Sequence, residues 1–492
     1  MGHSSEILFS GDRNILARPS ILTRLLMVVT STLMLSGILV GLPTAQASAS
    51  GADWVTVAAG YQHTCGTDTE QRISCWGVND YGQVGDGTYN TTEVPTLVKL
   101  SGSLAGLKFN QVSASYTHTC ALTVDGAAYC WGRNDQGQLG NTSITQSTNV
   151  PVPVDTSGVL DGLVITQIDT GFNHTCVLSD GSVYCWGAND DGQIGDGTFD
   201  YQPTPVAVDT SDVLAGKTIK EIGVGSLETC ALDTDGMVYC WGYGREGQIG
   251  DGTGTILNPY PVAVKSDGEL AGKTIAHISV GDAQACAVDV DGQTYCWGLN
   301  DAGQLGNGNK TTSNEPVVVS QTGILQTQTP SEVEAGGTFG CILTAEGKIA
   351  CWGDGNQGQL GNGQSGATQP GYHSTEPTNV LATGSGVLSG VTLVYISSGF
   401  AHTCVVSTTG RTYCWGLNDY GQLGNGVSTS VATGIPVLVK DPPPLPPTLL
   451  NSNAVVDQGT VGTYFVTTKL AEKASGYSLR FTLKSGTLPP GI

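Results

Sequence analysis

Short segments of alternating apolar and polar residues run from residue 53 to residue 441, and turn-forming residues separate them. One stretch reads FNQVSAS, then HTCALT and, after Asp125-Gly126, AAYCWG; the segment VPVPVDT follows a longer loop. Alternation with a period of two is typical of half-buried β-strands, and an Asp-Gly turn between two such segments predicts a tight hairpin. This part of the chain is therefore predicted to be all-β and built from short antiparallel strands.

The same order of segments recurs seven times. In every copy two cysteines bracket the hairpin turn, and the second cysteine is followed by Trp-Gly. The steps between successive second cysteines are 55, 55, 55, 56, 55 and 63 residues. A nearly constant period of this length is typical of a repeat architecture in which each repeat is one supersecondary unit.

The cysteine spacing predicts one disulfide in each repeat. A three-residue Val124-Asp125-Gly126 loop places Cys120 opposite Cys130, and a two-residue turn in the third repeat restores the same pairing although its cysteines lie one residue closer. Opposed residues of an antiparallel pair are within disulfide reach, and the chain has no Cys-x-x-Cys knuckle that would favour zinc. The predicted pairs are Cys65–Cys75, Cys120–Cys130, Cys176–Cys185, Cys230–Cys240, Cys286–Cys296, Cys341–Cys351 and Cys404–Cys414.

Two further features recur in every repeat. The tryptophan after each second cysteine is predicted to fill the seam between neighbouring sheets. A Gly-Gln-x-Gly segment follows it, as in residues 82–85, and glycine there permits backbone angles that other residues avoid. The Asp-Gly-Thr that often comes next suggests either a calcium loop, with Asp86, Asp196 and Asp251 as ligands, or a side-chain-capped turn; the turn is favoured because calcium needs six or more oxygens.

The N-terminal segment is typical of an export signal. Three arginines precede an apolar run at residues 25–42, and after Pro43 comes Ala45-Gln46-Ala47, a pattern that signal peptidase accepts. Residues 1–47 are predicted to be a cleaved signal peptide; the alternative is an uncleaved anchor. We expect a secreted or cell-surface protein with no membrane segment after cleavage, where oxidising conditions allow the disulfides to persist.

Composition narrows the classes of function. The chain has 492 residues, 70 of them glycine, and a formal net charge of −22, which argues against a nucleic-acid partner. We find no His-Glu-x-x-His and no Gly-x-Ser-x-Gly motif, and no paired carboxylates outside turns. We therefore expect no cofactor and no enzymatic activity.

The composite repeat GxxHTCaLtxDGxxyCWGxNDxGQLGdGt, as in residues 171–198, resembles the repeat of the regulator of chromosome condensation family. The resemblance covers residues 53–441 and implies a closed, seven-bladed β-propeller with four-stranded antiparallel blades, here of an exported bacterial type. Nucleotide exchange on a nuclear GTPase and ultraviolet sensing, both known in that family, are not expected to transfer, because the chain is predicted to be exported, is acidic and lacks the light-absorbing indoles at the corresponding site.

A different module is predicted after the repeats. Residues 442–447 form a Pro-rich linker, and residues 448–492 alternate in TYFVTT and YSLRFTL before ending in SGTLPPGI. This segment resembles the start of immunoglobulin-like modules of bacterial surface proteins. Because it has about half the length of a ~100-residue sandwich, it is expected to be a partial β-sandwich.

One position differs between repeats and supplies the candidate site. After the glycine, or Ser115 in the second repeat, that follows the first strand, four repeats carry an aromatic residue and two residues later a histidine; these are Tyr61, Tyr116, Phe172 and Phe400 with His63, His118, His174 and His402. In a closed ring the four repeats are consecutive, so the aromatic residues would form one arc. Clustered exposed aromatics mark binding surfaces, whereas the histidines are explained either by a structural hydrogen bond, the favoured interpretation, or by ligand binding.

We therefore predict an interaction module, expected to be monomeric, that binds a protein or glycan through one face of the propeller. The alternatives are a hydrolase or lyase with its site in the central opening and a structural spacer of an adhesin. Convergent Asp, Glu or His side chains inside the opening would favour an enzyme, while Gly, Ser and aromatic residues would favour binding.

Overall fold

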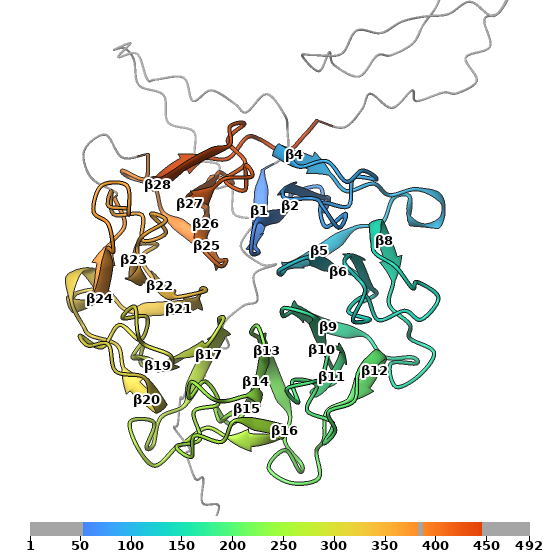
Figure 1. Cartoon of the computed structure of the whole chain (residues 1–492), viewed down its shortest axis with the longest axis horizontal. Helices are drawn as coiled ribbons and strands as arrows, with labels where there is room; N and C mark the ends of the chain where they lie inside the picture. The colour runs from blue at the N-terminus through green and yellow to red at the C-terminus, as the bar shows by residue number, and fades with distance from the viewer. Residues whose placement is uncertain (1–52, 382–386, 445–492) are drawn as a thin grey trace, which may run out of the picture. The chain divides into compact units, whose positions relative to one another are not determined.

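A computed structural model describes residues 53–381 and 387–444. In these residues the chain forms seven four-stranded antiparallel sheets, each made of four consecutive strands, arranged around a central opening (Figure 1). The predicted all-β, seven-bladed propeller is thereby confirmed. The predicted signal peptide and the partial sandwich lie outside the described residues. Within the described ranges, no helix has the length and apolar character needed to cross a membrane.

Each blade begins with its innermost strand and ends at the rim. Blade 1 contains β1 (Trp54–Ala59), β2 (His63–Asp68), β3 (Ile73–Gly77) and β4 (Thr92–Leu97). Blade 2 contains β5 (Phe109–Ala114), β6 (His118–Thr123), β7 (Ala128–Gly132) and β8 (Thr148–Pro153). Blade 3 contains β9 (Ile165–Thr170), β10 (His174–Ser179), β11 (Ser182–Gly187) and β12 (Gln202–Ala207). Blade 4 contains β13 (Ile219–Val224), β14 (Glu228–Asp233), β15 (Val238–Tyr243) and β16 (Leu257–Ala263).

The remaining blades follow the same order. Blade 5 contains β17 (Ile275–Val280), β18 (Gln284–Asp289), β19 (Thr294–Gly298) and β20 (Ser313–Val318). Blade 6 contains β21 (Pro330–Ala335), β22 (Phe339–Thr344), β23 (Ile349–Asp354) and β24 (His373–Asn379). Blade 7 contains β25 (Leu393–Ser398), β26 (His402–Ser407), β27 (Thr412–Asn418) and β28 (Thr429–Leu438). Two short 3₁₀ helices, η2 (Gly102–Leu104) and η3 (Gly323–Gln326), lie between blades 1 and 2 and between blades 5 and 6.

All seven predicted disulfides are present. In each blade the two cysteines are direct partners in the register of the second and third strands, as Cys65 and Cys75 are in β2 and β3. Their Cα atoms lie 4.0 to 4.1 Å apart, somewhat closer than the ~4.5 to 5.5 Å expected for opposed residues. Every bridge spans 9 or 10 residues, and the chain-entropy model gives such a short loop ~2.5 to 3 kcal/mol of stabilisation.

The tryptophans fill the seams between blades, as predicted. Trp131 of blade 2 is fully buried, and its Nε1 donates a hydrogen bond of 2.8 Å to the carbonyl oxygen of Gln83 in blade 1. The last glycine of the Gly-Gln-x-Gly segment is required here: Gly85 has a φ of +75°, and a Cβ atom on it would lie 2.6 Å from the Trp131 Nε1. The last glycine of the motif therefore allows the turn of one blade to contact the indole of the next blade closely.

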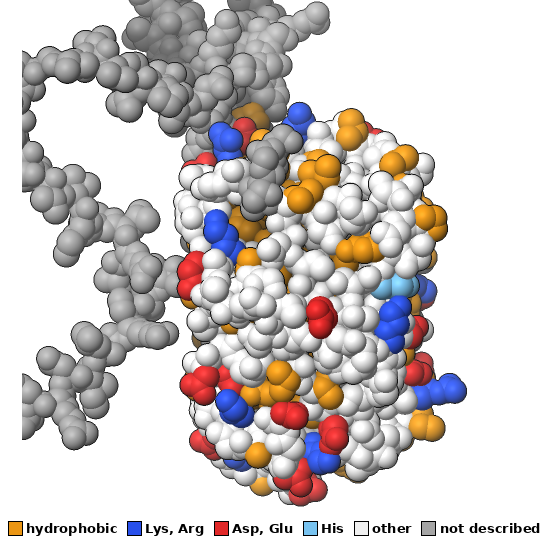
Figure 2. All heavy atoms as spheres, turned by 90° about the vertical axis from the view of Figure 1, so that its left-hand side faces the viewer, with side chains coloured by type: hydrophobic (Ala, Val, Ile, Leu, Met, Phe, Trp, Pro, Cys, Tyr) orange, Lys and Arg blue, Asp and Glu red, His pale blue; other side chains and the backbone are white. Residues whose placement is uncertain are grey.

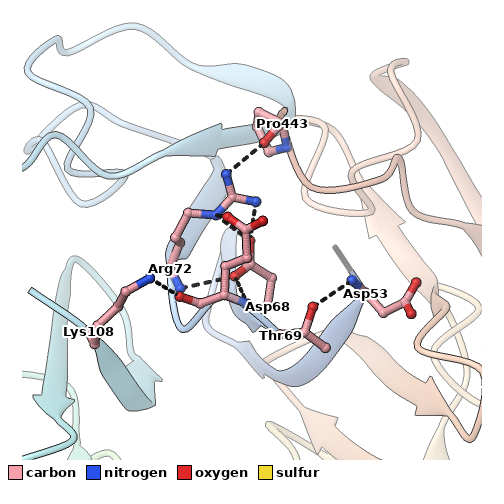
Figure 3. A network of polar contacts seen from close by, with 7 residues as sticks. Asp53, Asp68, Thr69, Arg72, Lys108 and Pro443 are labelled. Carbon is pink, nitrogen blue, oxygen red and sulfur yellow. Dashed lines mark hydrogen bonds and ion pairs between the residues drawn. The ribbon is translucent and has the colours of Figure 1, made fainter. Parts of the chain in front are cut away.

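The ring closes through the same contacts. Trp76 of blade 1 donates to the Gln422 carbonyl oxygen of blade 7 at 2.9 Å, and the Ala59 amide donates to Ser397 Oγ at 3.0 Å. Figure 3 shows a polar network at the β2–β3 turn of blade 1, where Arg72 donates to Asp68 and to the Pro443 carbonyl oxygen at 3.2 Å. Arg72 thus holds the segment that directly follows the propeller, at Pro443, against blade 1.

The Asp-Gly-Thr segments form turns capped by side chains. Asp86 Oδ1 accepts hydrogen bonds from the Thr88 amide at 2.8 Å and from its hydroxyl at 2.9 Å, and Asp196 holds Thr198 in the same way. These bonds occupy the carboxylate within its own turn, which agrees with the favoured interpretation of this segment.

The outer edge of every blade carries proline. Pro95 lies in β4 and Pro436 in β28, and the other outer strands have a proline at an equivalent position. Proline has no amide to donate, so these edges are poor templates for pairing with another sheet. Figure 2 shows one side of the rim, where hydrophobic, acidic and basic side chains are interspersed.

Candidate binding face

The four aromatic residues predicted as a site come together at one end of the central opening. Tyr61, Tyr116, Phe172 and Phe400 each follow the innermost strand of blades 1, 2, 3 and 7, and we call them the aromatic cluster. The Tyr61 and Tyr116 rings stack with centroids 3.7 Å apart, Phe400 lies 4.4 Å from Tyr61, and Phe172 meets the edge of Tyr116 at 4.2 Å. All four side chains are partly exposed. We call this end of the propeller the aromatic end.

The other three blades complete the aromatic end with small or polar residues. Ser226 of blade 4 donates a hydrogen bond to Asp282 of blade 5, and the Phe400 ring packs over Gly337 of blade 6, where a Cβ atom would lie 2.8 Å from Phe400 Cδ2. Burial raises the pKa of Tyr116, and contact with Tyr61 raises it further, so the phenol is neutral. The end is thus aromatic over four blades, polar over blades 4 and 5, and covered by Phe400 over the glycine of blade 6.

The histidines lie beneath the cluster and are wholly buried. His63 Nε2 lies 2.8 Å from Thr119 Oγ1 of the next blade, and that hydroxyl donates to the Gln83 carbonyl oxygen, so His63 Nε2–H is the donor to threonine. His118, His174 and His402 make the corresponding bonds to Thr175, Thr229 and Thr64. Burial lowers the pKa of His63 to about 3, with repulsion from His402 adding to the effect.

This placement agrees with the structural interpretation of the histidines, since they join neighbouring blades and are 0% exposed. A direct part of the histidines in binding stays a prediction. Glu228 and Gln284 replace histidine in blades 4 and 5, and the next blade then carries Ala285 or Gly340 in place of threonine. In blade 6 Phe339 replaces histidine, yet Thr403 of blade 7 is kept and donates to the Gln359 carbonyl oxygen at 3.3 Å.

A cavity of about 360 Å³ lies in the central opening and is lined by the innermost strands. The innermost strands place carboxylates there that sequence reasoning missed, namely Asp169, Glu221 and Glu334, and Asp282 lies at the aromatic end of the cavity. Each innermost strand has a register shift near its start, as between Ile219 and Glu221 of β13. Because such a bulge breaks simple alternation, the residues that face the cavity could not be read from the period-two pattern.

The polar groups in the cavity bond mainly to the neighbouring blade. Asp169 Oδ2 accepts from the Val224 amide at 2.8 Å, and the Gln167 side chain both donates to the Ile222 carbonyl and accepts from its amide. Burial raises the pKa of Asp169 to about 6, although its hydrogen bonds from Val224 and Ser113 act in the opposite direction. Acidic residues in the opening are expected of an enzyme, and Gly, Ser and aromatic residues are expected of a binding module. The cavity has acidic groups along its wall and Gly, Ser and aromatic residues at its end, so both kinds are present.

The Asn-Asp-x-Gly turns surround the aromatic cluster on the same end. The Val78 amide donates to the Gln62 carbonyl oxygen, next to Tyr61, and blades 2, 3 and 7 repeat this bond. The aspartates of these turns are exposed in the four blades that carry the cluster; they are Asp80, Asp135, Asp190 and Asp419. The aromatic end therefore combines an apolar centre with an acidic surround.

The fold and this end define a seven-bladed β-propeller whose blades are joined by side chains, with an asymmetric face suited to binding. The chain belongs to the RCC1-like family: the RCC1-like domain matches residues 91–466, and a Regulator of chromosome condensation (RCC1) repeat matches residues 54–83. This is a family of protein-interaction domains, largely without enzymatic activity of their own. The family resemblance noted from the sequence is thereby confirmed.

Individual relatives agree with this assignment. The chain is 32% identical over 364 residues to the human (Homo sapiens) E3 ubiquitin-protein ligase HERC2. The matched region is 73% of this chain but only 7% of HERC2. It is 29% identical over 325 residues to the Ultraviolet-B receptor UVR8 of Arabidopsis thaliana, covering 66% of this chain and 70% of UVR8. The activities in these names are those of the relatives.

Solved structures show the same fold. Prp20p of Saccharomyces cerevisiae has a TM-score of 0.63 at 20% identity, covering 79% of this chain and 88% of that chain. Human WBSCR16 has a TM-score of 0.61 at 22% identity, covering 72% of this chain and 86% of that chain.

Proposed function

We propose that this protein is an exported or cell-surface interaction module that binds a partner through the aromatic end of its propeller. The observation that carries the proposal is the aromatic cluster itself. Four aromatic side chains from consecutive blades gather at one end, and partly exposed aromatics of this kind are typical of the centre of protein interfaces.

Several features support export. All fourteen cysteines of the chain are paired, and disulfides persist in oxidising compartments. The apolar run and the Ala45-Gln46-Ala47 pattern of the N-terminal segment support the same location. An exported bacterial protein with immunoglobulin-like modules after the propeller is the form of the proposal that fits the whole sequence.

Relatives support a protein as the partner. Yeast Prp20p binds Gsp1p and histones, and Kap60 has been crystallised bound to the same protein. Those partners belong to Prp20p. Binding of proteins by this propeller type makes a protein the first class of partner to test and a glycan the second.

The test removes the cluster while leaving the seams intact. Oxidised propeller carrying Tyr61→Ala, Tyr116→Ala and Phe172→Ala is compared with wild type in pull-downs against cell-envelope proteins and on a glycan array. A matched control carries Phe199→Ala, Tyr201→Ala and Tyr260→Ala, which are exposed aromatics of blades 3 and 4 outside the cluster.

We expect the cluster variant to lose the partner captured by wild type, while the control keeps it and both retain the circular dichroism of the wild type. Equal capture by the cluster variant would refute the proposal. Failure of wild type to capture any protein or glycan would favour the structural spacer.

A further inference from the structure

The seam between blades 1 and 2 carries its own arginine at the aromatic end. The Arg133 guanidinium of blade 2 lies over the Tyr81 ring of blade 1, with its Cζ 5.2 Å from the ring centroid. The same guanidinium forms an ion pair with Asp135 at 2.5 Å. A tyrosine from one blade and an aspartate from the next therefore bind one planar cation between them.

The seam between blades 7 and 1 has the same framework. Trp76 and Thr64 donate to the Gln422 carbonyl oxygen at 2.9 and 2.8 Å, as Trp131 and Thr119 donate to that of Gln83 at 2.8 Å each. The tyrosine two residues before each glutamine is fixed alike, because the Tyr420 amide donates to Gln422 Oε1 and the Tyr81 amide to Gln83 Oε1, both at 3.0 Å.

The equivalent positions are therefore Tyr420 for Tyr81, Asp80 for Asp135 and Val78 for Arg133. Tyr420 is 40% exposed, compared with 37% for Tyr81, and Asp80 is also exposed. Within residues 53–381 and 387–444 no cation forms an ion pair with Asp80 or lies over Tyr420. The backbone of Glu93 packs against Gly421, next to Tyr420, and the Glu93 carboxylate accepts a hydrogen bond from Ser428 Oγ at 2.5 Å. This seam thus has the tyrosine and the aspartate but lacks the arginine.

We propose that the Tyr420–Asp80 seam binds an arginine side chain of the partner protein. This inference rests on the proposed function and adds that the partner protein presents an exposed arginine. Arginine fits better than lysine because its planar guanidinium stacks on a tyrosine ring while its fork donates to a carboxylate. The seam also lies within reach of the aromatic cluster, since the Val78 amide bonds to Gln62, the residue after Tyr61. A partner would place an apolar group on the cluster and an arginine in this seam.

The first experiment uses N-acetyl-L-argininamide as the probe and wild-type oxidised protein labelled with 3-fluorotyrosine. The Tyr420 signal in the fluorine NMR spectrum is assigned with Tyr420→Phe. We expect titration to shift this signal, with N-acetyl-L-lysinamide acting more weakly and N-acetyl-L-norleucinamide giving no shift. Asp80→Asn should weaken the probe ~3- to 10-fold, as expected for loss of the carboxylate beside a stacked cation. Gln136→Ala, at the position of Tyr420 in blade 2, is the matched control and should change nothing.

Two further variants test the site by filling one seam and emptying the other, and both must keep the circular dichroism of the wild type, because Val78 is only 7% exposed. Val78→Arg supplies the missing cation from the chain itself, as Arg133 does in the next seam, and should abolish the Tyr420 shift. Arg133→Ala vacates the other seam and should add a second probe-dependent signal from Tyr81. An unshifted Tyr420 signal, or an unchanged response in Val78→Arg, would overturn the inference.

Partner binding separates this inference from the proposed function. If Val78→Arg and Asp80→Asn keep full affinity for a partner that the cluster variant loses, the binding face stands and the arginine site is refuted. If both seam variants lose the partner ~3-fold or more while the Gln136→Ala control keeps it, the arginine site is supported.

Discussion

Replacing Thr119 with valine tests whether the buried histidines hold the blades together. The substitution keeps the shape of the side chain but removes the hydroxyl that accepts from His63 Nε2 at 2.8 Å. The Gln83 carbonyl oxygen keeps its hydrogen bond from Trp131. The main cost is therefore that the His63 Nε2–H group loses its acceptor. The other tautomer gives no relief, because His63 Nδ1 has no partner among the described residues. An unsatisfied polar group at a fully buried site costs ~1 to 3 kcal/mol, and we expect Thr119→Val to lower the free energy of unfolding by ~2 kcal/mol.

The assay is urea denaturation of the oxidised propeller, followed by tryptophan fluorescence. A second variant, His63→Phe with Thr119→Val, removes both polar groups; blade 6 already carries a phenylalanine, Phe339, at the histidine position, although Thr403 is kept in the blade that follows it. Because removing both partners is much less costly than orphaning one, the double variant should recover ~1 kcal/mol relative to Thr119→Val. A Thr119→Val protein as stable as wild type, or a double variant less stable than the single one, would refute the reasoning.

Two further substitutions test other buried positions. Glu228 is fully buried, and burial raises its pKa well above the usual value. The folded protein therefore holds the Glu228 proton to higher pH than the unfolded chain does. The contribution of Glu228 to the free energy of unfolding is greatest below pH 4.5 and declines as pH rises. Glu228→Gln should therefore stabilise the protein increasingly from pH 4 to pH 8 in thermal melts, with Gln284→Glu showing the opposite trend, and a pH-independent difference would contradict this. Gly85→Ala should destabilise by ~2 to 4 kcal/mol, because it combines a positive φ with contact against Trp131, whereas Gly102→Ala, at φ +63° with no atom within 4 Å, should cost only ~1 kcal/mol. Equal losses in chemical denaturation would argue against the close contact.

The repeat sequence predicts the blades well because its strongest signals are local. Cys120 and Cys130 bracket one turn, so loop length alone fixes their register, and the seven copies of Trp-Gly each mark the same seam. The number of blades follows from counting the repeats. That the four aromatic residues lie on consecutive blades also follows from the order of the repeats once the ring closes.

The sequence could not show where side chains meet across the ring. Tyr61 and Tyr116 stack because adjacent blades converge at the central opening, and this distance depends on the ring rather than on either repeat. The cavity carboxylates such as Asp169 were missed because the bulge in each innermost strand changes which residues face inward. The one signal available was the coupling of His63 with Thr119 in the following repeat, which recurs in three other seams.

Hydrogen–deuterium exchange of the protein with its captured partner tests the central claim most directly. The account predicts that protection on binding is concentrated at residues 60–62, 115–117, 171–173 and 399–401, with residues 78–82 and 418–421 beside them. Protection confined to the hairpin turns at the opposite end, such as residues 124–126 and 180–181, would contradict a binding site at the aromatic end.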